Sequence, residues 1–233
     1  MEILIIIIIV VSFVIYKIWR NVVVTKRNKE SIQSVTSLSR GTASERHLIL
    51  TLLKSGIHPQ AIFHDLYIAR NDGKFSQVDL VVATRVGIIV FEVKDFGGWI
   101  YGKGNQTKWT QVLAYGNEKY RFYNPIMQNN THIKQLRQKL KENVPFYSVI
   151  VFYGDSELRD ISFIPKGTFV TKWYRVIDVI SKIIQENPLA SYKNKHRVVE
   201  ILKEAVAKGD ELGIESQHIE NIKNMLGTDR IFQ

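Results

Sequence analysis

The chain contains no cysteine among its 233 residues. This absence excludes disulfide frameworks, zinc sites built on thiolates and cysteine nucleophiles. Other catalytic signatures are missing as well. The sequence has no H-E-x-x-H zinc motif, no G-x-x-x-x-G-K-[ST] phosphate loop and no kinase catalytic loop, although DFGG at residues 95–98 matches the kinase magnesium loop in part. Zinc hydrolases, P-loop NTPases and protein kinases are therefore excluded.

Charge is absent from the first apolar run, between Ile3 and Tyr16. Residues 3–19 would span roughly 25 Å as a helix, which is enough for a bilayer core when flanking side chains reach the interface. No basic residue precedes the run and no A-x-A-like cleavage site follows it. The pattern therefore favours a membrane anchor over a cleaved signal peptide. We expect a single-pass protein of the cell membrane that contacts the lipid bilayer through residues 3–19.

The positive charges that follow this run indicate its orientation. By the positive-inside tendency, the N-terminus lies outside and the rest of the chain lies in the cytoplasm. The net charge is +10, and the 32 basic residues outnumber the 22 acidic ones. Five cations adjoin the predicted anchor, and the remaining surplus is only mildly favourable for nucleic-acid binding. The five are expected to contact anionic lipid headgroups: Lys17, Arg20, Lys26, Arg27 and Lys29.

Composition divides the chain into four expected segments. Residues 1–20 form the anchor and residues 21–40 a basic juxtamembrane and polar linker, within which 28–43 reads as a tether. A globular core follows at 41–160, and a final strand with C-terminal helices occupies 161–233. Periodicity predicts strands and helices in alternation, which favours an α/β or α+β fold. Strands are expected near residues 63–70, 78–84, 86–94, 146–155 and 164–171, a hairpin or exposed loop at 97–109, and helices at 44–53, after 130, and at 173–186, 195–208 and 215–226.

Three charged residues interrupt two of these apolar strands. Asp79 lies in VDLVVAT, and Glu92 and Lys94 lie in VGIIVFEVK. A hairpin centred on Arg85–Val86 pairs positions whose numbers sum to 171, which places Asp79 opposite Glu92 and Lys94 on the same face as Glu92. A bulge at Gly87 would shift this register by one residue. A shared proton with a raised pKa, a divalent cation and a surface ion pair each explain such a cluster.

The order of motifs around these residues resembles the nuclease-related domain (NERD) family. The matching pieces are Glu45 in a helix after a Gly-containing turn, then HDLYI, QVDLVV, GIIVFEVKDFGG, IYG, a lone Trp109, NPIMQN followed by a helix, and a VIVF strand. Together they cover roughly residues 41–155. The resemblance implies a PD-(D/E)xK, restriction-endonuclease-like core with a mixed sheet of about four strands between helices. The core expected at 41–160 would then be the nuclease-related domain.

The same resemblance implies roles for individual residues. Asp79 and Glu92 would be metal ligands for Mg²⁺ (or Mn²⁺), and Lys94 would be the catalytic lysine. Glu45 matches the acidic residue of the first helix and Gln128 matches the NP-x-x-Q-N element. The sequence departs from the family at Leu80, where relatives often carry His; this puts a role for that position in doubt and leaves the ligand set complete.

Structural explanations compete with several of these roles. Glu45 suits a helix N-terminus as an acid of the first turn, and Gln128 could brace the helix that follows it. Trp109 and Tyr101 could stack on bases, but packing is the simpler expectation. We expect a membrane-anchored, divalent-metal-dependent nuclease that hydrolyses phosphodiester bonds, with DNA as substrate, on the cytoplasmic face. The alternative is a catalytically silent, membrane-tethered nucleic-acid-binding or adaptor module on the same fold.

Overall fold

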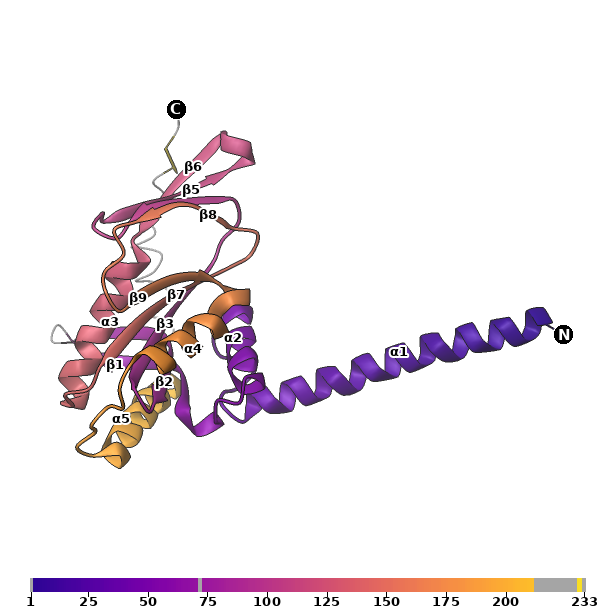
Figure 1. Ribbon diagram of the computed structural model, residues 1–233, viewed down its shortest axis with the longest axis horizontal. Helices are drawn as coiled ribbons and strands as arrows, with labels where there is room; N and C mark the ends of the chain where they lie inside the picture. The colour runs from indigo at the N-terminus through magenta and orange to yellow at the C-terminus, as the bar shows by residue number, and fades with distance from the viewer. Residues whose placement is uncertain (1, 71–72, 212–229, 232–233) are drawn as a thin grey trace.

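A computed structural model describes residues 2–70, 73–211 and 230–231 (Figure 1). The helix expected at 215–226 lies outside the described residues. The described chain forms a long N-terminal helix and an α/β body built on two mixed sheets, so the expected fold class is confirmed. Short 3₁₀ turns join some of its elements: η1 (Pro59–Ala61), η2 (Ala114–Gly116), η3 (Trp173–Arg175) and η4 (Lys208–Asp210).

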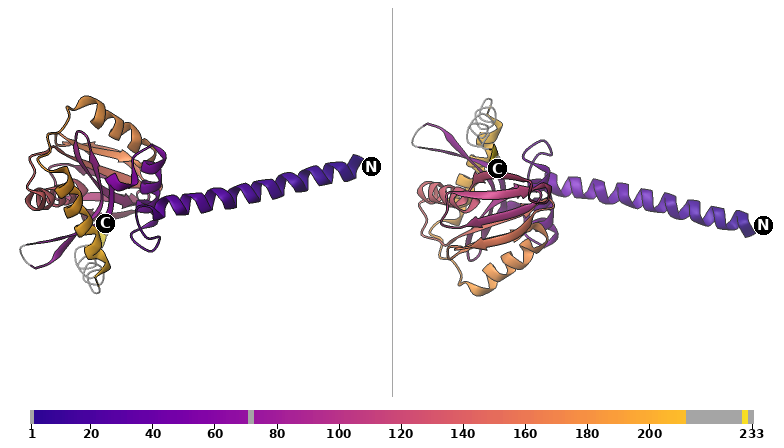
Figure 2. Two further views of the ribbon diagram at one scale, coloured as in Figure 1. Left: turned by 90° about the horizontal axis from the view of Figure 1, so that it is seen from below. Right: turned by 90° about the horizontal axis from the view of Figure 1, so that it is seen from above.

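Helix α1 (Glu2–Gln33) projects away from the body, as the views in Figure 2 show from below and above. Its stretch from Ile5 to Gln33 has a mean hydropathy of 2.0 in its most apolar window, and none of that window is buried. By length and composition it could cross a membrane. The tether expected at 28–43 is partly wrong, because α1 continues to Gln33. The segment NKESIQ contains neither Gly nor Pro, so nothing in it stops a helix that has already begun.

The first sheet has the strand order β1-β2-β3-β7-β9. Strands β1 (Ile62–Ala69), β2 (Phe75–Thr84) and β3 (Gly87–Asp95) are antiparallel, whereas β7 (Phe146–Tyr153) and β9 (Thr168–Lys172) continue the sheet in parallel with β3. One face packs on α2 (Ala43–Lys54) and α4 (Val176–Glu186). The other packs on α3 (Pro125–Leu140) and α5 (Lys195–Ala207). The expected sheet of about four strands therefore has five.

The second sheet has the order β10-β6-β5-β4-β8 and lies above the first in Figure 1. Strands β4 (Trp99–Lys103) and β5 (Lys108–Leu113) are the expected hairpin. Sequence reasoning did not predict β6 (Glu118–Tyr123), β8 (Glu157–Ser162) or β10 (Arg230–Ile231). The segments EKYRFY and ELRDIS are too polar to read as buried strands. They form here because neighbouring strands supply their backbone partners.

Trp109 joins the second sheet to the first. Its side chain is fully buried and stacks on Phe152 of β7 with ring centroids 6.2 Å apart, and its Nε1 donates to the Lys103 carbonyl at 3.0 Å. Gly102 lies against the indole so closely that a Cβ there would fall 2.2 Å from the ring. Trp109 is thus a packing residue, whereas Tyr101 is 36% exposed on the surface.

We predict that Gly102→Ala destabilises the body by about 1–3 kcal/mol, because the added methyl must displace a fully packed indole. Gly97→Ala is the matched control, since its Cβ would meet its nearest neighbour, Leu113, only at 4.0 Å. Urea or thermal unfolding of the full chain measures both variants. Equal stability of the two variants would contradict the proposed contact.

Candidate active site

The β2–β3 hairpin has the register that the sequence predicts. Leu80 pairs with Phe91 and Thr84 pairs with Gly87. The residue numbers of each backbone pair from Leu80 to Thr84 sum to 171, and no bulge interrupts the turn. Asp79 and Glu92 are the next positions along the two strands. At these positions a side-chain hydrogen bond takes the place of the backbone pairing, because Asp79 Oδ2 accepts from the Val93 amide at 2.7 Å. This bond holds the Asp79 carboxylate beside β3.

Glu92 is a buried carboxylate in the middle of the sheet. It is 1% exposed, and its Oε1 lies 2.6 Å from Lys94 Nζ. Its Oε2 lies 3.4 Å from His132 Nε2, and neither of these two atoms has a hydrogen-bond partner in the described part of the chain. Burial by itself would raise the pKa of Glu92, but the positive charge of Lys94 and the nearby His132 outweigh it and lower that pKa. Glu92 is therefore held as a carboxylate.

The pKa of Asp79 is shifted upward, in the opposite direction to that of Glu92. Burial, followed by the negative charges of Glu92 and Glu45, raises the pKa of Asp79 well above its usual value. Lys94 and the Val93 amide oppose this rise without cancelling it. Two acids close together with pKa values displaced in opposite directions are characteristic of sites that bind a cation or move a proton.

Lys94 connects the two carboxylates with helix α3. Burial would lower the pKa of Lys94, but Glu92 and Asp79 outweigh burial and raise it, so the ammonium form persists. Its Nζ donates to Gln128 Oε1 at 3.1 Å. Asn124 and Pro125 fix the start of α3, because the Asn124 side chain accepts from the Ile126 amide and Pro125 occupies the first turn. The first turns of α3 therefore place Gln128 beside Lys94.

Glu45 lies nearby but has other hydrogen-bond partners. It accepts from Thr42 Oγ1 at 2.8 Å, and His64 Nε2 lies 3.0 Å from its Oε2. The other ring nitrogen of His64 is 2.9 Å from Thr36 Oγ1, just beyond α1. Gly41 fits closely against this group with a φ of +62°, since a Cβ there would fall 2.4 Å from Glu45 Oε2. Glu45 therefore acts on Asp79 through its charge rather than through a direct hydrogen bond.

Asp65 is a further acid that the register brings towards the site. It falls between the pairs His64–Leu80 and Leu66–Val78, opposite Asp79, but it has no ladder partner and its φ is 56°. This left-handed backbone is uncommon for a residue other than glycine. The carboxylate instead accepts from Arg40 Nε at 2.9 Å and also from Gln77. Its charge is thus balanced by Arg40 rather than added to the Asp79–Glu92 pair.

Sequence reasoning missed two residues that support the site. His132 lies four residues after Gln128, a spacing that puts both on one face of a helix and could have identified it. Asn129 donates from Nδ2 to the Val90 carbonyl and to Ser148 Oγ, both at 2.9 Å, and so fastens α3 to β3 and β7. Asn129 is the last residue of the NPIMQN motif, but the sequence does not indicate its role, because its partners lie on two different strands.

The candidate site offers few ligands to a divalent ion. Within the described residues, no group of three or more His, Cys, Asp or Glu side chains is arranged to hold a metal. Asp79 and Glu92 supply two carboxylates, and Glu92 Oε2 is a buried acceptor without a hydrogen bond from the described residues. Mg²⁺ typically takes one or two carboxylates and completes its shell with water and substrate phosphate. The residues present therefore fit Mg²⁺ or Mn²⁺ and do not resemble a closed structural metal site.

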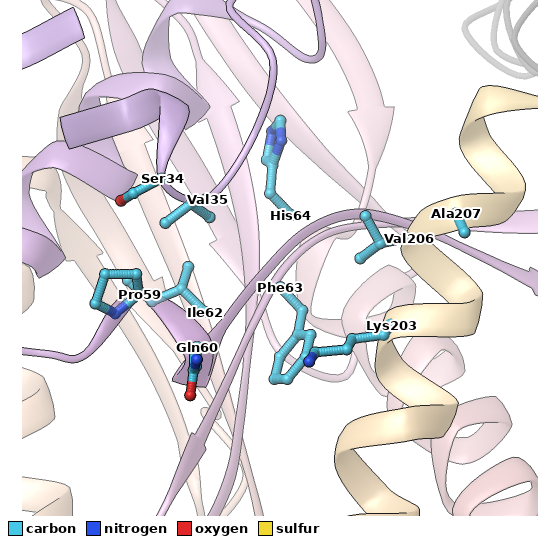
Figure 3. Close-up of a pocket in the computed structure, with 10 residues that line it drawn as sticks. All are labelled: Ser34, Val35, Pro59, Gln60, Ile62, Phe63, His64, Lys203, Val206 and Ala207. Atoms are coloured by element: carbon cyan, nitrogen blue, oxygen red, sulfur yellow. The ribbon is translucent and has the colours of Figure 1, made fainter. Parts of the chain in front are cut away.

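A separate cavity of about 300 Å³ lies where the end of α1, the start of β1 and α5 meet (Figure 3). His64 is at its edge, but Asp79, Glu92 and Lys94 do not line it. The cavity is thus distinct from the charged cluster. Its lining residues are Ser34, Val35, Pro59, Gln60, Ile62, Phe63, His64, Lys203, Val206 and Ala207.

The sequence is similar to those of known proteins. The chain is 25% identical over 185 residues to the uncharacterized protein pXO1-01 of Bacillus anthracis, and the alignment covers 79% of this chain and 84% of that protein. No solved structure matches the chain. Residues 40–153 match the nuclease-related domain family, NERD, close to the limits expected from the motifs. This match covers just under half of the chain and points, at the family level, to a nuclease-like hydrolase.

Proposed function

We propose that this chain is a membrane-anchored, divalent-metal-dependent nuclease that hydrolyses phosphodiester bonds, with DNA as substrate, on the cytoplasmic face. The observation that carries the proposal is the placement of the buried Glu92 and the half-buried Asp79 on neighbouring strands, with Lys94 beside Glu92, inside the nuclease-related segment. An apolar or packing role does not account for two neighbouring carboxylates within a sheet, because their repulsion costs stability.

Asp79 and Glu92 would hold the ion between the neighbouring strands β2 and β3. When bound, a divalent ion neutralises charge on a phosphodiester and lowers the pKa of a water molecule. Hydrolysis adds water across one P–O bond and leaves a phosphate monoester and a hydroxyl group. Lys94 would stabilise the negative charge that develops on the phosphoryl oxygens, because its ammonium form is retained. Gln128 would orient Lys94, and His132 would orient Glu92.

The proposed location follows from α1. Residues 3–19 would lie in the bilayer of the cell membrane with the N-terminus outside and the nuclease-related domain in the cytoplasm. The cations Lys17, Arg20, Lys26, Arg27 and Lys29 would meet anionic headgroups. The exposed apolar side chains along α1 support this location, since water would solvate them poorly.

Cleavage should depend on Glu92 and Lys94. We predict that Glu92→Gln and Lys94→Ala each reduce metal-dependent hydrolysis of DNA on the order of 10²–10³-fold, because each removes charge from the reacting centre. The measurement is cleavage of labelled linear, circular and single-stranded DNA, and of RNA, by the detergent-solubilised chain with Mg²⁺, Mn²⁺ or EDTA. Lys182→Ala, an exposed change on α4, is the control and should retain activity. Nucleic-acid binding without cleavage under every metal would instead favour a catalytically silent module.

Metal binding should also be visible without catalysis. We predict that saturating Mg²⁺ or Mn²⁺ raises the unfolding temperature of the wild-type chain by about 5 °C or more, because a ligand of the native state stabilises it. Asp79→Asn should abolish most of this rise, while its metal-free form should be at least as stable as wild type, since the amide removes repulsion with Glu92. Asp160→Asn, an exposed change on β8, should leave the rise intact. Equal shifts in all three proteins would argue against Asp79 as a ligand.

A further inference from the structure

A polar groove of about 470 Å³ runs along the outer side of α3, next to the end of β1. Ile68, Ala69 and Arg70 form its β1 side. The α3 side is polar throughout and contains no acidic residue: Thr131, Lys134, Gln135, Gln138 and Lys139. The whole of α3 carries three cations and no Asp or Glu over its 16 residues, so nothing on the helix neutralises the groove.

A stripe of polar residues on α3 connects the groove with the candidate active site. Gln128, Thr131, Gln135 and Gln138 are spaced by three and four residues and so form one stripe along the helix. The first of them contacts Lys94. His132, next to Thr131, lies near Glu92 through one ring nitrogen and 2.9 Å from Ser76 Oγ through the other. Ser76 pairs with Ile68 of the groove. The stripe extends about 15 Å from Gln128, which matches roughly four nucleotide steps of a B-form strand.

Two lysines on the α3 side of the groove are available for a ligand. Lys134 is exposed and Lys139 is half-buried, and neither forms an ion pair within the described part of the chain.

We propose that this α3 groove binds the sugar–phosphate backbone of the nucleic-acid strand next to the scissile phosphate, an inference that rests on the proposed nuclease function. Lys134 and Lys139 neutralise phosphates, and Thr131 and Gln138 supply the neutral hydrogen bonds that commonly position a backbone without reading sequence. The groove thus sets the path of the strand into the site and favours no particular base sequence.

The test separates binding from cleavage by working in EDTA. The detergent-solubilised full chain is titrated onto a fluorescent single-stranded DNA and its duplex at several salt concentrations. The groove variant is Lys134→Glu with Lys139→Glu, and Lys54→Glu with Lys182→Glu is the control. The control makes the same charge change on exposed sites of α2 and α4, on the opposite side of the first sheet. Unfolding temperatures verify that both variants fold.

We expect the groove variant to bind at least about tenfold more weakly at low salt, with a salt slope smaller by roughly 1.5–2 for two lost phosphate contacts. The control should change far less. Gln138→Ala should weaken binding with an unchanged salt slope, because it removes a neutral contact, and it remains informative if the charge reversal unfolds the protein. Equal losses in the groove variant and the control would overturn the proposal, as would a groove variant that loses affinity only for anionic phosphatidylserine vesicles.

The outcomes also separate the groove from the nuclease. If the wild-type chain cleaves DNA and the groove variant binds DNA normally, only the proposed role of the groove is wrong. Selective loss of binding in the groove variant, with no cleavage under any metal, supports the groove and defeats the nuclease function. Failure of the wild-type chain to bind DNA or RNA defeats both.

Discussion

The buried charge of Glu92 is the constraint on which the rest of the body depends. A carboxylate that is 1% exposed within a five-stranded sheet would be expelled or protonated without compensation. Lys94, two residues along the same strand, supplies the compensating charge at 2.6 Å. Lys94 is itself largely buried and needs Gln128, which requires the start of α3 to be fixed by Asn124 and Pro125. The buried charge of Glu92 therefore requires fixed positions for the end of β3 and for the start of α3.

The second sheet contributes to the same arrangement from the outside. Its strands β4, β5 and β6 are inserted between β3 and β7, and the chain leads directly from β6 into α3 through Asn124. The Asn124 side chain donates to carbonyls of Lys103, Gly104 and Gln106, so the loop of the β4–β5 hairpin and the start of α3 are tied together. Trp109 then anchors that hairpin on β7. The hairpin thus serves as a support that holds α3 against the site, in addition to covering one side of the core.

The sequence predicted those features that local geometry determines. The register of Asp79 and Glu92 followed from a very short turn, because two residues between strands leave little freedom in pairing. The strands β1, β3 and β7 are nearly continuous apolar runs and could be read directly. Strands β6 and β8 could not, since their polar sequences acquire strand structure only from partners distant in the chain. The role of Asn129 was missed for a related reason: the role of a buried polar residue is recognisable only once its partner is known. The proximity of Gln128 to Lys94 required the family resemblance, and its role remains a prediction.

The continuity of α1 has a mechanical consequence. With residues 3–19 in a bilayer, residues 20–33 would form a rigid helical segment about 21 Å long rather than a flexible linker. Its far end is fastened to the body, because Thr36 is buried against His64 and Arg40 binds Asp65 and the Val206 carbonyl. The helical segment and the body would then rotate together about the membrane normal, with the body at a fixed distance from the membrane. A nucleic acid would then reach the site only within a thin layer parallel to the bilayer. This restricted approach would select among substrates before the hydrolysis step.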